Sequence, residues 1–438
     1  MKHWFRDTHF RSLMKNVSYL AASRAVAAAC GIATLAFAAR GLGVAMFGML
    51  VLVHSYTQAA SGLTKFQSWQ LIIRYGSPAL VTGEPRALKE AVGFAFALDV
   101  VSGIFGMIAA MALLPLLGPW FGIPQQYLWL AMIYCTLLPT MAAATPGGVL
   151  RTLDRFDLMS WQGTSYPIAR ALLVFIAWWQ QLSFAWYVGI WFVTDMGGDL
   201  YQWFLAWREL RRRDLLKGIR PTLNPKGLPG AWKFAVTVNL SSSLTLAWGP
   251  VARLIVGGLL GPVSAGLYRV ASGLSDSAQK PAELLSKAYF PEVMRMDLAS
   301  KRPWKLMLRA ILLACAFGAV AVLIIVLGGR LLLDTLFGAE FVAAYEVLLV
   351  IIAAPLLAML SFPLPSMLYA LDRPDATLKA RLAGTLAYFA IVAPLATRFD
   401  TVGAAAALVL GNAVMVLVLA LYVRHEYRRV RVRKAETI

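Results

Sequence analysis

The chain has 438 residues, of which 59% are hydrophobic and 14% are charged, and it carries a net charge of +19 from 41 basic against 22 acidic residues. This apolar excess lies well outside the range of soluble domains and excludes a soluble enzyme. In a soluble protein the positive charge would indicate nucleic acid, but membrane proteins gather Lys and Arg in cytoplasmic loops, so no nucleic-acid partner is expected.

Twelve apolar stretches follow one another along the chain, each close to or above the roughly 20 residues that a helix needs to cross a bilayer. The first six are expected near residues 17–39, 44–63, 91–117, 127–149, 163–182 and 186–207. The second six are expected near residues 232–260, 263–285, 306–327, 343–371, 380–395 and 402–423. The pattern predicts an all-α polytopic membrane protein with about twelve transmembrane helices.

The basic residues predict the orientation of these helices. With the N-terminus inside, the cytoplasmic segments hold 34 of the 41 Lys and Arg residues. The outer connections hold three, which are Arg40, Arg330 and Arg398. This asymmetry predicts that both termini are cytoplasmic.

An internal repeat divides the chain. The sequence Leu-Asp-Arg-x-Asp occurs at residues 153–157 and again at 371–375, an offset of 218 residues, and Gly43 maps onto Gly261 at the same offset. Half of the chain is 219 residues, so we predict two six-helix lobes, residues 1–217 and 218–438. Both lobes then have the same orientation, a pattern typical of transporters with a central cleft between parallel repeats.

Four basic residues, Arg24, Arg170, Arg253 and Arg269, lie within predicted spans. A charge in hydrocarbon is costly, so such residues normally face a bundle interior or a water-filled cavity. Arg24 and Arg253 are the best candidates for ligand binding, with a structural pair to an aspartate as the alternative. Arg269 could instead reach the interface, and Arg170, beside Pro167, is expected to be structural.

Polar stripes mark the second and the eighth spans, which are equivalent in the two halves. In the eighth span, Arg269 and Asp276 lie on one helical face. The second and seventh spans carry further polar residues, namely His54, Gln58, Lys65, Asn239 and Ser243. We expect these faces to line the cleft.

The acidic residues within the spans are candidates for coupling transport to an ion. Asp195 and Asp199 are spaced as i and i+4 beside two glycines, and Asp99 lies in the third span. A proton or sodium site and a set of structural ion pairs both remain open for them. For the two Leu-Asp-Arg-x-Asp loops, helix caps and surface ion pairs are the favoured interpretation.

The sequence contains no visible catalytic constellation. It has four histidines, and His54 is the one that lies in a span, so neither a metal cluster nor an acyl-transfer triad is supported. No glycine-rich phosphate loop is present in an α/β setting. We therefore expect no cofactor, no metal and no enzymatic activity.

Short motifs resemble those of a known family. They include Gly41-Leu42-Gly43 with Phe47-Gly48, the run Gln70–Tyr75, Leu336-Phe337-Gly338 and Val402-Gly403-Ala404-Ala405. This combination resembles the bacterial polysaccharide flippases of the multidrug/oligosaccharidyl-lipid/polysaccharide exporter superfamily. The resemblance implies two six-helix lobes around a central cleft, and location in the bacterial cytoplasmic (inner) membrane.

The resemblance also implies a substrate, an undecaprenyl-diphosphate-linked oligosaccharide moved from the inner to the outer leaflet. Arginine suits a diphosphate through charge-assisted, bidentate hydrogen bonds. The expected substrate-binding residues are Arg24 and Arg253 for the diphosphate, Arg269, Lys65 and Asp276 near them, and Gln58, Asn239 and Ser243 for sugar hydroxyls. Expected partners are the lipid-linked oligosaccharide, membrane lipid, a glycan polymerase and a chain-length regulator.

Two alternatives remain open. A drug or small-solute exporter of the same superfamily would need to accept free cations, which an excess of arginine over acidic residues disfavours. A membrane glycan polymerase or ligase would need a sizeable outer loop with catalytic Arg or His, whereas the longest outer connection is expected near residues 328–341.

Overall fold

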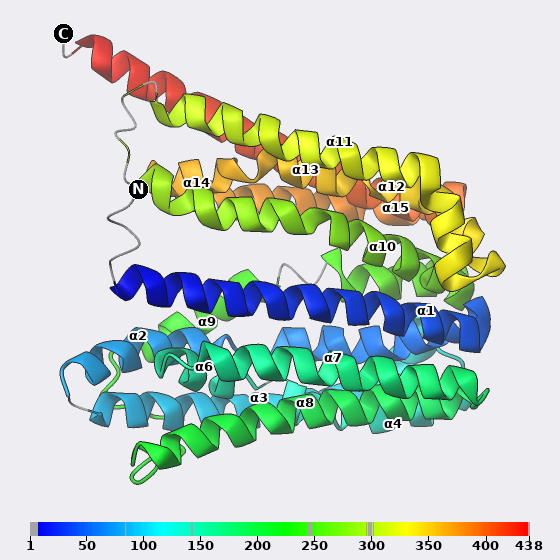
Figure 1. Ribbon diagram of the computed structural model, residues 1–438, viewed down its shortest axis with the longest axis horizontal. Helices are drawn as coiled ribbons and strands as arrows, with labels where there is room; N and C mark the ends of the chain where they lie inside the picture. The colour runs from blue at the N-terminus through cyan, green and yellow to red at the C-terminus, as the bar shows by residue number, and fades with distance from the viewer. Residues whose placement is uncertain are drawn as a thin grey trace. The chain divides into compact units, whose positions relative to one another are not determined.

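The computed structural model describes residues 8–83, 85–141, 143–243, 248–294, 296, 300 and 302–436. Across these residues the regular elements are helices (Figure 1). The first ten are α1 (Thr8–Thr64), α2 (Ser68–Val81), α3 (Arg86–Trp120), η2 (Gln125–Tyr127), α4 (Leu128–Cys135), α5 (Leu138–Met141), α6 (Thr145–Thr152), α7 (Phe156–Trp179), α8 (Phe184–Arg212) and α9 (Ala231–Ser243). They are followed by α10 (Pro250–Met294), α11 (Arg302–Phe337), η4 (Ala339–Ala343), α12 (Ala344–Ile351), α13 (Ala353–Ser361), α14 (Pro363–Ala370) and α15 (Pro374–Glu436).

The predicted all-α membrane fold is confirmed. Among the described residues, six helices are long and apolar enough to cross a membrane, and a bent pair over 125–152 can form a seventh span. Three of the six contain a backbone break, at Gly43, Gly261 and Phe399–Asp400, close to the expected boundaries between consecutive spans. α7 and α8 correspond to the predicted fifth and sixth spans.

The chain forms two compact units. The first comprises residues 1–46 and 52–251, and the second comprises 47–51 and 252–438. Residues 218–251, which include α9, therefore pack with the first unit, and residues 47–51 of α1 pack with the second. The functional division into lobes 1–217 and 218–438 stays a prediction.

Local geometry repeats between the two halves at the predicted offset. Gly43 and Gly261 both adopt positive φ with extended ψ, at (67°, 170°) and (86°, 176°), a conformation open essentially to glycine alone. Asp154 and Asp372 adopt φ of 56° and 57° in the two Leu-Asp-Arg-x-Asp turns. The amide of the following arginine donates to a main-chain carbonyl at 2.8 Å in both turns. The matched turns support a structural repeat.

A helix absent from the predicted spans, α2, packs in the first unit against α3 and α6. Gly148 of α6 permits this contact, because a Cβ atom there would lie 2.7 Å from the Cα atom of Trp69. Ile72, Leu88 and Val149 share one apolar cluster with residues of α8. The cluster fixes the ends of α3, α6 and α8 that carry the polar residues described below.

In the second unit, the tenth span is divided into η4, α12, α13 and α14. These short helices pack between α11 and α15, which run alongside them in Figure 1. Met359 and Met367 lie in a buried cluster with residues of α10 and α11, and Leu368 lies in one with residues of α15. The breaks lie shortly before Pro355 and Pro363, whose nitrogens cannot donate a hydrogen bond to the preceding helical turn.

Candidate functional site

A network of polar side chains lies among the spans of the first unit, centred on Asp195 of α8. Its carboxylate accepts a hydrogen bond from Arg170 of α7, and one of 2.5 Å from the hydroxyl of Tyr134 in α4. His54 Nε2 of α1 lies 3.5 Å from Asp195 Oδ2. The side chain of Asp195 is 14% exposed. Three helices, α1, α4 and α7, therefore bring titratable groups to one carboxylate on α8.

Arg170 is held on several sides. Besides the ion pair with Asp195, its Nε donates to Thr194 Oγ1 at 2.7 Å. Its guanidinium also lies over the rings of Tyr166 and Trp191, at 5.7 and 5.5 Å from their centroids. These contacts agree with the structural role expected for Arg170.

A second polar group continues from this network toward the end of the second span. Lys65 Nζ donates to the main-chain carbonyl of Met141 at 2.9 Å and interacts electrostatically with Asp199. Asn239 Nδ2 donates to the main-chain carbonyl of Lys65 at 2.9 Å, and Ser243 Oγ donates to the main-chain carbonyl of Asn239 at 3.1 Å. Four residues predicted from three different spans thus lie in one connected set.

Asp99 is fully buried and lies in a different setting. Its carboxylate accepts hydrogen bonds from Ser68 Oγ at 2.5 Å, from the amides of Ala144 and Thr145 at 2.7 and 2.8 Å, and from Thr145 Oγ1 at 2.7 Å. The two amides belong to the start of α6, and Ser68 opens α2. Asp99 therefore acts as a capping residue that joins three helices.

In the second unit, α10 gathers a mainly cationic group. Arg253 interacts electrostatically with Arg269 and Asp276, and the ring of Tyr268 lies close enough to share these interactions. Tyr268 is 2% exposed, and its hydroxyl makes no hydrogen bond within the described part of the chain. Among the interactions described, this group therefore holds two guanidinium groups and one carboxylate.

Arg24 lies on an exposed part of α1. The neighbouring Ser23 Oγ donates to the carbonyl of Ser160 at 2.9 Å, which docks α1 on α7. Arg24 interacts electrostatically with Arg151, whose guanidinium lies 4.1 Å from the ring centroid of Trp69. Gln58 is half-buried on the second span. The first unit therefore places two cations near each other, Arg24 and Arg151.

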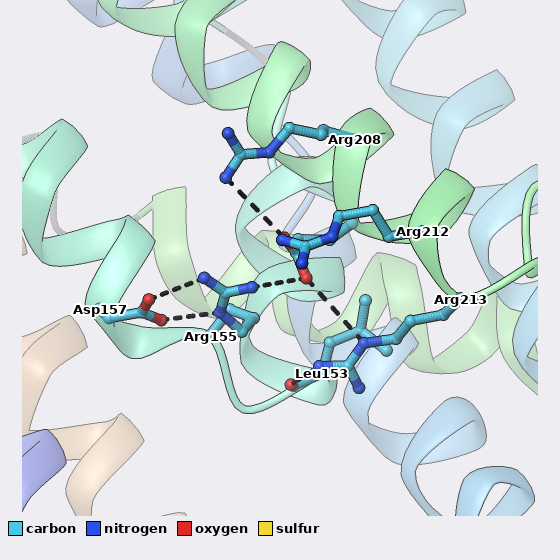
Figure 2. A network of polar contacts seen from close by, with 7 residues as sticks. Leu153, Arg155, Asp157, Arg208, Arg212 and Arg213 are labelled. Carbon is cyan, nitrogen blue, oxygen red and sulfur yellow. Dashed lines mark hydrogen bonds and ion pairs between the residues drawn. The ribbon is translucent and has the colours of Figure 1, made fainter.

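The Leu-Asp-Arg-x-Asp turns contain an ion-pair network that sequence reasoning identified only in part. Arg155 pairs with Asp157 at 2.8 Å, as expected, but also with Glu209 at the end of α8, at 2.6 Å. Figure 2 shows Arg155 between Asp157 and the arginines of α8, with Arg213 donating to the carbonyl of Leu153 at 3.1 Å. The hydrogen bonds, first to Asp157 and then to Glu209, raise the pKa of Arg155 above its usual range.

The second half repeats this arrangement. Arg373 pairs with Asp375 at 3.2 Å and with Glu426 of α15 at 2.7 Å. Sequence analysis did not single out Glu209 or Glu426. Each lies two residues before a run of arginines, which is the sequence signal that could have identified them. The two motifs thus tie the hairpin before one span to the end of the next.

No group of three or more His, Cys, Asp or Glu side chains suited to a metal ion occurs among the described residues. The described arrangement instead provides charged groups that bind, orient or exchange protons. Within the spans these groups form a balanced network around Asp195, a cationic group around Arg253 and a capping carboxylate at Asp99.

Comparisons with known proteins agree with this description. Residues 13–296 match the family described as polysaccharide biosynthesis protein. The inner membrane protein YghQ of Escherichia coli (strain K12) is 40% identical over 351 residues, which cover 80% of this chain and 99% of that protein.

Two solved structures share the fold. An inward-facing multidrug resistance MATE family transporter of the MOP superfamily superposes with a TM-score of 0.72 at 14% identity, over 92% of this chain and 95% of that one. The lipid II flippase MurJ, in an inward closed conformation, superposes with a TM-score of 0.72 at 12% identity, over 94% of this chain and 90% of that one. The chain therefore belongs to the polysaccharide biosynthesis protein family and has the fold of the MOP superfamily, as its sequence motifs predicted.

Proposed function

We propose that the protein is a flippase that moves an undecaprenyl-diphosphate-linked oligosaccharide from the inner to the outer leaflet of the bacterial cytoplasmic membrane. The observation that carries the proposal is the cationic group of α10, in which Arg253 interacts electrostatically with Arg269, and both arginines interact with Asp276, within the membrane-spanning region. A diphosphate would neutralise this group. The family match over residues 13–296 supports a role in polysaccharide biosynthesis.

Each proposed binding residue has a chemical role. Arg24 and Arg253 bind the diphosphate, because a guanidinium forms paired hydrogen bonds with phosphate oxygens. Arg269, Lys65 and Asp276 set the charge along the path. Gln58, Asn239 and Ser243 offer the neutral donors and acceptors that suit sugar hydroxyls.

Arg24→Ala and Arg253→Ala are each expected to lower glycan export by about tenfold or more, since each removes a charge-assisted contact with the diphosphate. Export is measured as surface polysaccharide in cells that carry the variant as the single copy, with membrane insertion verified by immunoblot. Arg253→Lys should retain part of the export, because it keeps the charge but loses the paired geometry.

The matched control is Arg398→Ala, which removes an exposed arginine that lies over the ring of Phe399, at 5.6 Å. This variant should export normally. Full export by both Arg24→Ala and Arg253→Ala would contradict the proposed binding role. Export of free cationic compounds by the native protein would instead favour a drug exporter.

The network of Asp195 supports a second part of the proposal, coupling of transport to an ion. Asp195 and the nearby Asp199 lie with His54, Tyr134 and Arg170, so a proton or sodium ion that binds there would change contacts between four spans. Asp99 was a third candidate, but its four hydrogen bonds favour capping.

Asp195→Asn is expected to reduce flipping driven by an imposed ion gradient by about tenfold, while gradient-independent exchange continues. The measurement uses proteoliposomes with a proton gradient or a sodium gradient across the membrane. Asp214→Asn, which changes an exposed acid in the turn after α8, should leave both rates unchanged. Equal gradient response in Asp195→Asn and the native protein would rule out coupling at Asp195.

The proposal also gives the protein a place in the cell. The distribution of Lys and Arg supports a cytoplasmic location for both termini. A polymerase and a chain-length regulator would act on the glycan after translocation, on the outer side. A role as polymerase or ligase itself would require sugar-bond formation by the purified chain, which we expect to be absent.

A further inference from the structure

An apolar groove of about 360 Å³ lies on the first unit, where α3, α6, α8 and the segment after α8 meet. Phe96, Val149, Trp203, Trp207 and Ile219 are among its walls. The volume falls within the range of about 300–1,000 Å³ that is typical of ligand sites. The lining has almost no polar surface, so the groove suits a hydrocarbon chain and not a sugar or a phosphate.

The outer wall of the groove is held closely against α3. At Gly93 a Cβ atom would lie 2.2 Å from the carbonyl oxygen of Arg220, so only glycine allows this approach. Ile219 and Pro221 on either side of Arg220 line the groove. The segment after α8 is therefore a fixed wall and carries Arg220 at the edge of the groove.

The edge of the groove is strongly basic. Residues 208–220 contain six Lys and Arg against two acidic residues, and one of these, Glu209, is 2% exposed with four arginines within 4.0 Å. Arg211 is exposed and lies over Trp207, a groove wall, at 5.4 Å from the ring centroid. Within the described residues, the guanidinium of Arg211 makes no hydrogen bond or ion pair, and Arg208 Nε is buried without a hydrogen-bond partner.

We propose that this groove binds one acyl chain of an anionic phospholipid, whose phosphate lies against Arg211 and Arg220. Tryptophan and arginine at the end of a span mark the level of lipid headgroups. A phosphate there gains charge-assisted hydrogen bonds with the arginines. The ammonium group of a zwitterionic headgroup is repelled by the same positive edge, so an anionic lipid is preferred. The site is independent of the proposed translocation function, and failure of one leaves the other standing.

Native mass spectrometry of the purified full chain tests this proposal. The protein is mixed with equal amounts of phosphatidylglycerol and phosphatidylethanolamine of identical acyl chains, and bound lipids are counted. The native protein should retain mainly phosphatidylglycerol. The double variant Arg211→Gln/Arg220→Gln should lose this preference, by roughly fivefold for each charge removed. Trp207→Ala, which removes a wall, should lower retention of both lipids.

Arg429→Gln is the matched control, because residue 429 is equivalent to residue 211 at the repeat offset of 218. Arg429 is exposed and pairs with Glu426 at 3.6 Å. Its replacement should leave the lipid preference unchanged. Equal retention of the two lipids by the native protein would overturn the proposal. Equal loss of phosphatidylglycerol in Arg429→Gln and the double variant would also overturn it, since general surface charge would then explain binding.

Discussion

Glu209→Ala is expected to destabilise the protein by about 3–5 kcal/mol, since removal of one partner of a buried ion pair leaves the other charge without compensation. Glu209 is 2% exposed, lies 2.6 Å from Arg155, and is approached by Arg208, Arg212 and Arg213 (Figure 2). Its loss would leave several arginines in mutual repulsion. The hairpin before α7 would also detach from the end of α8. Thermal unfolding of the purified protein in detergent should shift downward by about 3–5 °C, given the unfolding entropy expected for a chain of this length.

Two controls separate this network from general surface charge. Asp157→Ala removes the other partner of Arg155, but Asp157 is 48% exposed, so a change within about 0.5 kcal/mol is expected. Glu426→Ala removes the equivalent carboxylate of the second half, which has fewer basic neighbours, and should have a smaller effect than Glu209→Ala. An unfolding temperature for Glu209→Ala equal to that of Asp157→Ala would contradict a stabilising role for this network.

Asp99→Ala is expected to have a similarly large effect, of about 3–5 kcal/mol, because four buried donors would lose their acceptor. The donors come from the starts of α2 and α6, so these ends should loosen from α3. We expect low yield of folded protein and faster proteolysis near residues 141–145. Yield from membranes and a time course of limited proteolysis measure both effects.

Asp99→Asn distinguishes capping from ion coupling. The amide oxygen can accept the hydrogen bonds of Ala144 and Thr145, and the amide nitrogen can donate to Ser68. This variant should therefore retain most of the stability and most of the glycan export. Loss of export in a fully stable Asp99→Asn protein would show that the charge of Asp99 serves transport, and would restore it as an ion-coupling residue.

The transmembrane architecture could be predicted from the sequence because hydrophobicity and glycine act locally. Apolar stretches predicted the spans, and three of the expected boundaries between spans lie close to backbone breaks, at Gly43, Gly261 and Phe399–Asp400. The repeat could be predicted because the five-residue motif Leu-Asp-Arg-x-Asp recurs at an offset of 218 residues, and the structure gives both copies the same turn geometry. Helix α2 was missed, because its 14 residues are too few to cross a bilayer and give no signal of a span.

The partners of the charged residues could not be predicted in the same way, because pairing depends on which helix faces which. Asp195 was recognised as an unusual acid, yet nothing local indicated that Arg170, Tyr134 and His54 would meet it. Asp99, like Asp195, was a candidate for ion coupling by its position within a predicted span. In the structure its carboxylate instead caps the starts of two helices. Glu209 looked like an ordinary acid at a helix end, although its side chain is the most enclosed acid of the ion-pair network.

Depletion of the protein, followed by location of the lipid-linked oligosaccharide in each leaflet, tests the central claim most directly. Leaflet location is measured by the access of a membrane-impermeant glycosidase or lectin to inverted and right-side-out vesicles. The proposed flippase function predicts that the oligosaccharide accumulates on the inner leaflet and becomes inaccessible from outside. Continued appearance of the oligosaccharide on the outer leaflet at the normal rate would contradict it.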